Sequence, residues 1–164
     1  MKRYVLYNPM SGNGTGAEEA KKLNGFLKDG ELVFDDMTKI SDYKEWFSRI
    51  TDDDEIYICG GDGTLNRFVN DTCDIEYGAD IFYFASGSGN DFIRDLGKEK
   101  GTEPFCINEY LKDLPVATVK GKDYRFINGV GYGIDGYCCV VGDELRGKTD
   151  KPINYSAIAV KGLL

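Results

Sequence analysis

The sequence predicts an α/β fold: an open parallel sheet with helices on both faces, followed by the start of a second, β-rich unit. Short and nearly all-apolar runs alternate with segments of helical periodicity, which is typical of parallel strands buried between helices. Three of four such runs end directly in loops rich in Gly, Asn, Asp and Ser. Because parallel strands end at one edge of a sheet, we expect these loops to gather there.

The elements of the first part follow from periodicity. Apolar, β-prone runs predict four strands, over 3–7, 31–34, 55–59 and 81–85. Apolar side chains at helical spacing predict helices between them, over 17–27, 42–50, 65–70 and 90–96. The first strand is followed by a loop over 8–15, which leads into the first helix.

A polar segment over 97–104 is interpreted as a linker, and after it the alternation of apolar strands and helices ends. Strands over 116–119 and 125–128 are expected to pair antiparallel, and a helix is expected over 154–164. We therefore expect a nucleotide-binding α/β domain over 1–104. Residues 105–164 are expected to begin a truncated β-rich domain.

Composition excludes several functions. The net charge of −8 argues against nucleic acid as a partner, because such proteins need a basic surface. The chain has no histidine, which removes the Ser-His-Asp triad and the common zinc-protease motif, so acid–base work falls to carboxylates, Lys, Tyr or water. Five cysteines without a C-x-x-C pair, and no signal-like or membrane-spanning apolar run, predict a cytosolic protein with reduced thiols.

The first loop, from Asn8 to Gly16, joins a strand to a helix. Its glycines allow backbone N–H groups to approach an anion, and the helix N-terminus adds a favourable partial charge. No G-K-[ST] follows, and the third glycine comes one residue too early for G-x-G-x-x-G, so an ordinary flexible loop is the alternative.

The second loop is Gly60-Gly61-Asp62-Gly63-Thr64. Asp62 could cap the helix that follows, or it could hold Mg²⁺ or orient a reacting hydroxyl. Three glycines beside a carboxylate exceed what capping needs, which favours the chemical role.

The third loop, from Ser86 to Phe92, repeats this logic after the fourth strand. Asn90 or Asp91 could cap the next helix, and Phe92 is expected in the core. Arg94 could reach a phosphate or lie in solvent, and the sequence leaves both open.

Taken in order, three motifs resemble the diacylglycerol kinase catalytic family. They are Asn8-Pro9-x-Ser11-Gly12, the second loop, and Gly87-Ser88-Gly89-Asn90-Asp91-Phe92. That family includes bacterial lipid kinases, is similar to sphingosine and ceramide kinases, and is more distantly related to NAD kinases and phosphofructokinases. Residues 127–135 resemble the segment that opens its β-rich second domain. Ser86 stands where the family commonly has proline.

The resemblance implies a cytoplasmic enzyme that transfers the γ-phosphoryl group of ATP, with Mg²⁺, to a lipid alcohol such as diacylglycerol. It implies transient membrane contact through the full-length protein and leaves a homo-oligomer open. Asp62 is the expected catalytic residue. The expected nucleotide-binding residues are Asn8, Pro9, Ser11, Gly12, Gly14, Gly60, Gly61, Gly63, Thr64, Gly87, Ser88, Gly89, Asn90 and Asp91. Carboxylates that serve the family near its C-terminus are expected to lie outside this chain, which is therefore expected to be inactive alone.

Three other functions stay open at this point. One is a nucleotide-binding module without catalysis, and another is a kinase of a soluble substrate like the NAD kinases. The third is a dinucleotide-binding fold that uses Gly12, Gly14 and Gly16 with Asp35 or Asp36, although it leaves the second and third loops unexplained.

Overall fold

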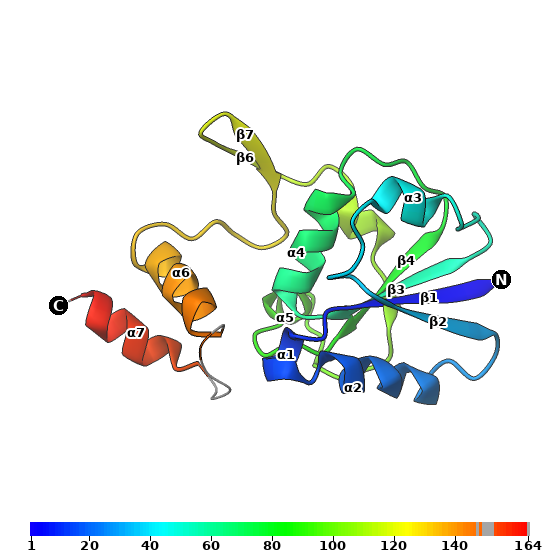
Figure 1. Ribbon diagram of the computed structural model, residues 1–164, viewed down its shortest axis with the longest axis horizontal. Coiled ribbons are helices and arrows are strands. Elements are labelled where there is room, and N and C mark those ends of the chain that lie inside the picture. The colour runs from blue at the N-terminus through cyan, green and yellow to red at the C-terminus, as the bar shows by residue number, and fades with distance from the viewer. Residues whose placement is uncertain (147, 149–152, 164) are drawn as a thin grey trace. The chain divides into compact units, whose positions relative to one another are not determined.

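The computed structural model describes residues 1–146, 148 and 153–163 (Figure 1). The chain divides into two compact units, Met1–Asn128 and Gly129–Leu164. The first unit contains the sheet and all three glycine-rich loops, so it is the part that positions the candidate site.

A five-stranded sheet in the order β2-β1-β3-β4-β5 forms the centre of the first unit (Figure 1). The first four strands pair in parallel and the short fifth strand pairs antiparallel to β4. Their bounds are β1 Lys2–Tyr7, β2 Glu31–Asp36, β3 Glu55–Gly60, β4 Asp80–Ala85 and β5 Phe105–Cys106. The predicted fold class, an α/β fold built on a mainly parallel sheet, is confirmed.

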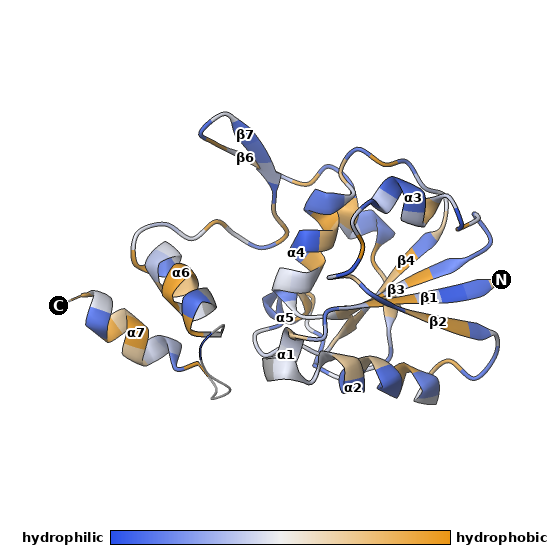
Figure 2. Ribbon diagram, in the orientation of Figure 1, coloured by the Kyte–Doolittle hydropathy of each residue, from blue (hydrophilic) through white to orange (hydrophobic). Residues whose placement is uncertain are grey.

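Helices cover both faces of this sheet. Successive strand residues point to opposite sides, so each face carries apolar side chains that a helix layer buries. Tyr4 and Leu6 of β1 face a core formed with α3 (Tyr43–Phe47), α4 (Asp62–Asp71) and α5 (Asp91–Asp95). Val5 faces the other way, against α2 (Gly16–Lys21) and a 3₁₀ turn, η1 (Lys22–Gly25). The apolar strands between these layers are visible in Figure 2.

Element boundaries differ from the predicted ones where local chemistry intervenes. The predicted helix over 17–27 ends at residue 21 and continues as η1, which contains the weak helix formers Asn24 and Gly25. Helix α3 is shorter than the predicted 42–50, and Asp42 caps it by accepting hydrogen bonds from the amides of Lys44 (2.8 Å) and Glu45 (3.2 Å). The first loop contains a short helix, α1 (Ser11–Gly14).

A second, two-stranded sheet follows within the first unit. Strands β6 (Val116–Val119) and β7 (Lys122–Arg125) pair antiparallel, after the 3₁₀ turn η2 (Asn108–Leu111). The second strand was predicted three residues later, at 125–128. It comes earlier because residues 120 and 121 adopt positive φ angles, 51° and 77°, and form a tight two-residue turn.

Residues 97–104, predicted as a linker, connect α5 to β5 within the first unit. The compact first unit extends to Asn128. A boundary at residue 104 between nucleotide-binding and lipid-binding domains stays a prediction.

The described residues of the second unit form two helices, α6 (Ile134–Arg146) and α7 (Tyr155–Gly162). The side chain of Asn154 caps α7 by accepting a hydrogen bond from the Ala157 amide (3.0 Å). In the part of the chain that is described, β7 is therefore the last strand, and the elements after it are helices instead of the expected further strands. Among those residues, no helix has the length and apolarity needed to cross a membrane.

Candidate functional site

The second and third loops meet at the backbone carbonyl of Gly60, the last residue of β3. This oxygen accepts hydrogen bonds from the Ser86 amide (2.8 Å), the Gly87 amide (3.2 Å) and the Tyr83 hydroxyl (3.1 Å). These three hydrogen bonds to the Gly60 carbonyl hold the two loops side by side at the carboxyl edge of the sheet.

Gly61 and Gly87 pack against each other without room for a side chain. A Cβ on Gly87 would lie 2.3 Å from the Cα of Gly61, and one on Gly61 would lie 3.0 Å from the Cα of Gly87. Real Cβ atoms essentially never come as close as 2.3 Å, so Gly87 requires glycine, and the 3.0 Å contact at Gly61 is tighter than nine in ten real Cβ contacts. The loops predicted to share one edge therefore touch directly.

The first loop closes on itself and reaches the third loop. The backbone carbonyl of Asn8 accepts hydrogen bonds from the amide (3.0 Å) and the hydroxyl (2.8 Å) of Ser11. A Cβ on Gly16 would lie 1.9 Å from that same oxygen, so this turn also needs glycine. A Cβ on Gly12 would lie 3.4 Å from the carbonyl oxygen of Ser86, which places the first loop beside the third.

Asp62 lies at this junction, but it does not cap its own helix. Helix α4 has Gly61 as N-cap, with no side-chain hydrogen bond. The carboxylate instead accepts hydrogen bonds from the first-turn amides of α5: Asp91 N to Oδ2 (3.0 Å) and Phe92 N to Oδ1 (2.9 Å). The predicted capping alternative is thus wrong for α4, because the carboxylate is used to join the second loop to the third.

Asn90 is the N-cap of α5, yet it makes no capping hydrogen bond with its side chain. It adopts a left-handed conformation (φ 56°) and is only 3% exposed, and its Nδ2 donates to the Gly87 carbonyl (2.8 Å). Its Oδ1 is buried without a partner among the described residues. Asparagine adopts this conformation more readily than most residues, so the feature to explain is the buried oxygen, which a bound ligand or water could satisfy.

An ion pair lies beside the third loop. Asp91, at the start of α5, forms an exposed ion pair with Arg94 (2.7 Å). The hydrogen bond to Asp91 raises the pKa of the Arg94 guanidinium. The sequence left open whether Arg94 lies in solvent or reaches a phosphate. In the structure its side chain is exposed to solvent and paired with the Asp91 carboxylate.

The other predicted site residues surround this junction. Thr64 is buried, and its side chain fills the space beside the Cα of Gly60. Gly14, Gly63, Ser88 and Gly89 are exposed, and Pro9 is half-buried. A Cβ on Gly89 would lie 3.4 Å from Asp62 Oδ2 and 4.0 Å from Asp91 Oδ2, so the two carboxylates flank this glycine. The structure therefore gathers all three predicted loops into one cluster.

Two buried side chains of the cluster make contacts that the sequence does not predict. Tyr83 lies within the apolar run of β4, where the sequence indicates only a core ring and not a role for the hydroxyl. Burial raises the pKa of this hydroxyl. Ser86 is 1% exposed, and its hydroxyl lies 3.5 Å from Cys59 Sγ. Burial raises the pKa of the Cys59 thiol to about 11, so this thiol is a packing group. Phe92 lies in the core, as predicted.

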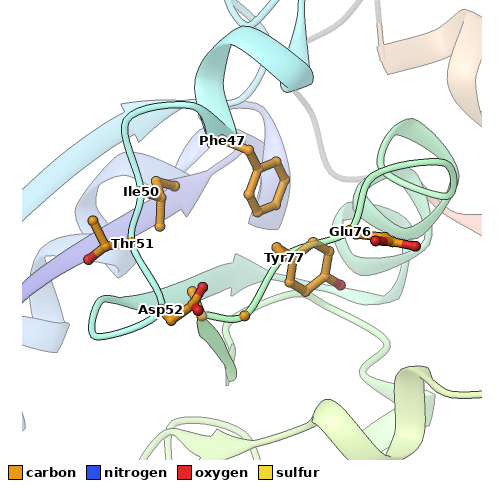
Figure 3. A pocket seen from close by; sticks show the side chains of 8 residues that line it. Phe47, Ile50, Thr51, Asp52, Glu76 and Tyr77 are labelled. Atoms are coloured by element: carbon orange, nitrogen blue, oxygen red, sulfur yellow. The ribbon is translucent and has the colours of Figure 1, made fainter.

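A cavity of about 400 Å³ lies at the opposite ends of the strands (Figure 3). Its lining comes from the segments that precede β3 and β4, including the stacked rings of Phe47 and Tyr77 (centroids 4.8 Å apart). Asp52 and Glu76 add carboxylates to its rim. Because it lies at the amino ends of β3 and β4, this cavity is separate from the loop cluster.

The family model described as the diacylglycerol kinase catalytic domain matches residues 2–118 of the chain. The matched region contains the entire sheet and all three loops. No solved structure matches the chain significantly.

Proposed function

From the premise that this chain belongs to the diacylglycerol kinase catalytic domain family, we propose that the protein is an ATP-dependent lipid kinase. It transfers the γ-phosphoryl group of ATP to the hydroxyl of a lipid such as diacylglycerol. The observation that carries this proposal is the junction of three glycine-rich loops at one sheet edge, locked by the Gly60 carbonyl, the Gly61–Gly87 contact and the Asp62 carboxylate.

The loops supply groups suited to holding phosphates. Helix α4 is ten residues long and begins at Asp62, and the amides of Thr64 and Leu65 already donate to the Gly61 carbonyl. The helix therefore offers an anion the earlier amides of Asp62 and Gly63, and its partial positive charge lies beside the third loop. Glycine backbones around them leave space for an anion to approach. In phosphoryl transfer, such positioning and charge stabilisation provide most of the catalysis.

The carboxylates at this site fit Mg²⁺ held jointly by the protein and the nucleotide phosphates. The described residues contain no group of three or more His, Cys, Asp or Glu that could hold a metal ion. Mg²⁺ in kinases is usually bound through one or two carboxylates plus substrate phosphates, and Asp62 and Asp91, which flank Gly89, are the carboxylates that would hold it. Bound there, the ion would neutralise phosphate charge.

Asp62 has the catalytic role in this proposal. Each carboxylate oxygen accepts one backbone amide, and each can accept a further interaction. The same side chain can therefore hold the loops together and also orient a substrate hydroxyl or help to hold Mg²⁺. The proposal places the enzyme in the cytoplasm, with transient membrane contact to reach the lipid.

Binding of ADP with Mg²⁺ to this chain is the first expected result. The chain contains the three loops, and we expect weak binding because the second wall of the cleft is expected outside it. Isothermal titration with ADP and Mg²⁺ measures the affinity, and NAD⁺ is titrated in parallel. Binding of NAD⁺ without binding of ADP would favour the dinucleotide-binding alternative instead.

Lipid phosphorylation is expected from the full-length protein and not from this chain alone. Phosphoryl transfer needs both partners aligned in a site closed to bulk water, and the loops provide only the nucleotide side. Radiolabelled ATP with diacylglycerol, sphingosine and ceramide, tested on both proteins, measures the transfer. Robust transfer by this chain would show that it carries the whole active site, and no transfer by the full-length protein would refute the kinase proposal.

A further inference from the structure

Asn70, in the last turn of α4, joins that helix to strand β7. Its Nδ2 donates to the Arg125 carbonyl (2.8 Å), and its Oδ1 accepts from the Arg125 amide (2.9 Å). The second Nδ2 hydrogen bond goes to the carbonyl of Asn66, one turn earlier (2.8 Å). All three contacts engage a side chain that is half-buried, which makes this an ordered clasp between residues 55 positions apart.

The geometry of the β6–β7 hairpin explains why Arg125 needs such a partner. Arg125 lies opposite Val116, and the next residue, Phe126, donates its amide to the Pro115 carbonyl (3.2 Å). Hydrogen-bonded and non-hydrogen-bonded pairs alternate in an antiparallel ladder, so the N–H and C=O of Arg125 point away from β6. The side-chain amide of Asn70 occupies this free edge as a neighbouring strand would.

From these contacts we infer that Asn70 is a positioning residue, which fixes the exit of the chain from the first unit relative to the Gly60–Thr64 loop. Helix α4 begins in that loop and ends at the clasp. Arg125 lies three residues before the end of the first unit at Asn128, and Ile127 between them packs against the core. Helix α4 therefore links the Gly60–Thr64 loop to the point where the chain leaves strand β7.

This inference rests on the proposed function for its consequence. The β6–β7 hairpin lies in the segment expected to begin the lipid-substrate domain, and the clasp sets where this hairpin lies relative to the nucleotide loop. Misplacement by about 1 Å can cost about 100-fold in rate. The clasp should therefore affect transfer to the lipid while leaving nucleotide affinity unchanged.

The chemistry of the amide provides graded variants. Asn70→Ala removes both hydrogen bonds to Arg125. Asn70→Asp keeps an acceptor for the Arg125 amide but has no donor for its carbonyl, so half of the clasp remains. Asn24→Ala is the matched control, because Asn24 is exposed and its amide bonds only locally, to the Lys21 carbonyl (2.7 Å).

Hydrogen exchange at the Arg125 amide, measured by NMR on this chain, tests the clasp without any assay of activity. We expect exchange at least tenfold faster in Asn70→Ala, near-wild-type exchange in Asn70→Asp because it keeps the acceptor for this amide, and no change in Asn24→Ala. Asn70→Leu, which keeps the approximate shape of the side chain and removes both hydrogen bonds to Arg125, carries the test if the alanine variant does not fold. Unchanged exchange at Arg125 in the variant without the acceptor would overturn the clasp.

The positioning role is tested in the full-length protein below its unfolding temperature. We expect kcat for the lipid to fall at least tenfold in Asn70→Ala, with the Kd for ADP and Mg²⁺ within twofold of wild type. Faster exchange with unchanged kcat would overturn the positioning role, because a role in stability alone leaves the folded enzyme's turnover intact. A wild-type protein that phosphorylates no lipid would refute the kinase proposal, while the exchange result would still decide the clasp.

Discussion

Replacing Gly87 with alanine is expected to weaken binding of ADP and Mg²⁺ by about 100-fold, which corresponds to about 2.7 kcal/mol. The new Cβ would lie 2.3 Å from the Cα and 2.9 Å from the amide nitrogen of Gly61. Both atoms belong to the backbone, so no side chain can rotate away. The second and third loops must separate, and the separation strains the hydrogen bond from the Gly87 amide to the Gly60 carbonyl.

The loops should separate without loss of the fold. Overpacking of this kind typically costs about 1–3 kcal/mol of stability, which urea denaturation will measure beside the titration. Gly25→Ala is the matched control, because nothing lies within 4 Å of a Cβ at that position and its φ is not positive. A Gly87→Ala variant that binds ADP as tightly as the control would show that the contact between the loops does not shape the binding site.

Replacing Asp62 with asparagine is expected to abolish kinase activity in the full-length protein, by at least about 100-fold, while the α/β fold persists. Two effects combine. The loss of charge removes a group that can act on a metal or a proton. The loss of one oxygen also leaves either the Asp91 or the Phe92 amide facing an NH₂ group, since each carboxylate oxygen now accepts one amide.

The control variant Asp42→Asn distinguishes a capping role of an aspartate from a chemical one. Asp42 caps α3 with one oxygen that accepts two amides, so asparagine can replace it with little loss. We expect full turnover in this control and a loss of turnover in Asp62→Asn, measured as transfer of radiolabelled phosphate to lipid. Wild-type turnover in Asp62→Asn would show that the Asp62 carboxylate serves only to cap α5.

The sequence alone determined the features that depend on local pattern. Burial on both faces makes strands such as β3 almost wholly apolar, and this texture predicts a parallel sheet without knowledge of strand order. Glycine-rich loops directly after strands predict a shared edge, because parallel strands all end there. Helix ends were less certain, since α2 stops where η1 begins and α4 starts three residues before its predicted first residue. These ends depend on local helix propensity and on backbone hydrogen bonds at the caps, such as those from the Thr64 and Leu65 amides to the Gly61 carbonyl.

Only the tertiary structure decided which groups meet across the loops. From sequence, Asp62 could cap the helix it begins or act on a metal or a hydroxyl, but only packing brings the start of α5 within hydrogen-bonding distance of it. The Tyr83 hydroxyl reaches the Gly60 carbonyl because β3 and β4 are neighbours in register. Asn70 pairs with Arg125 because the hairpin turns early and exposes one edge to α4. Such contacts join residues 23 to 55 positions apart, and periodicity within one segment carries no information about them.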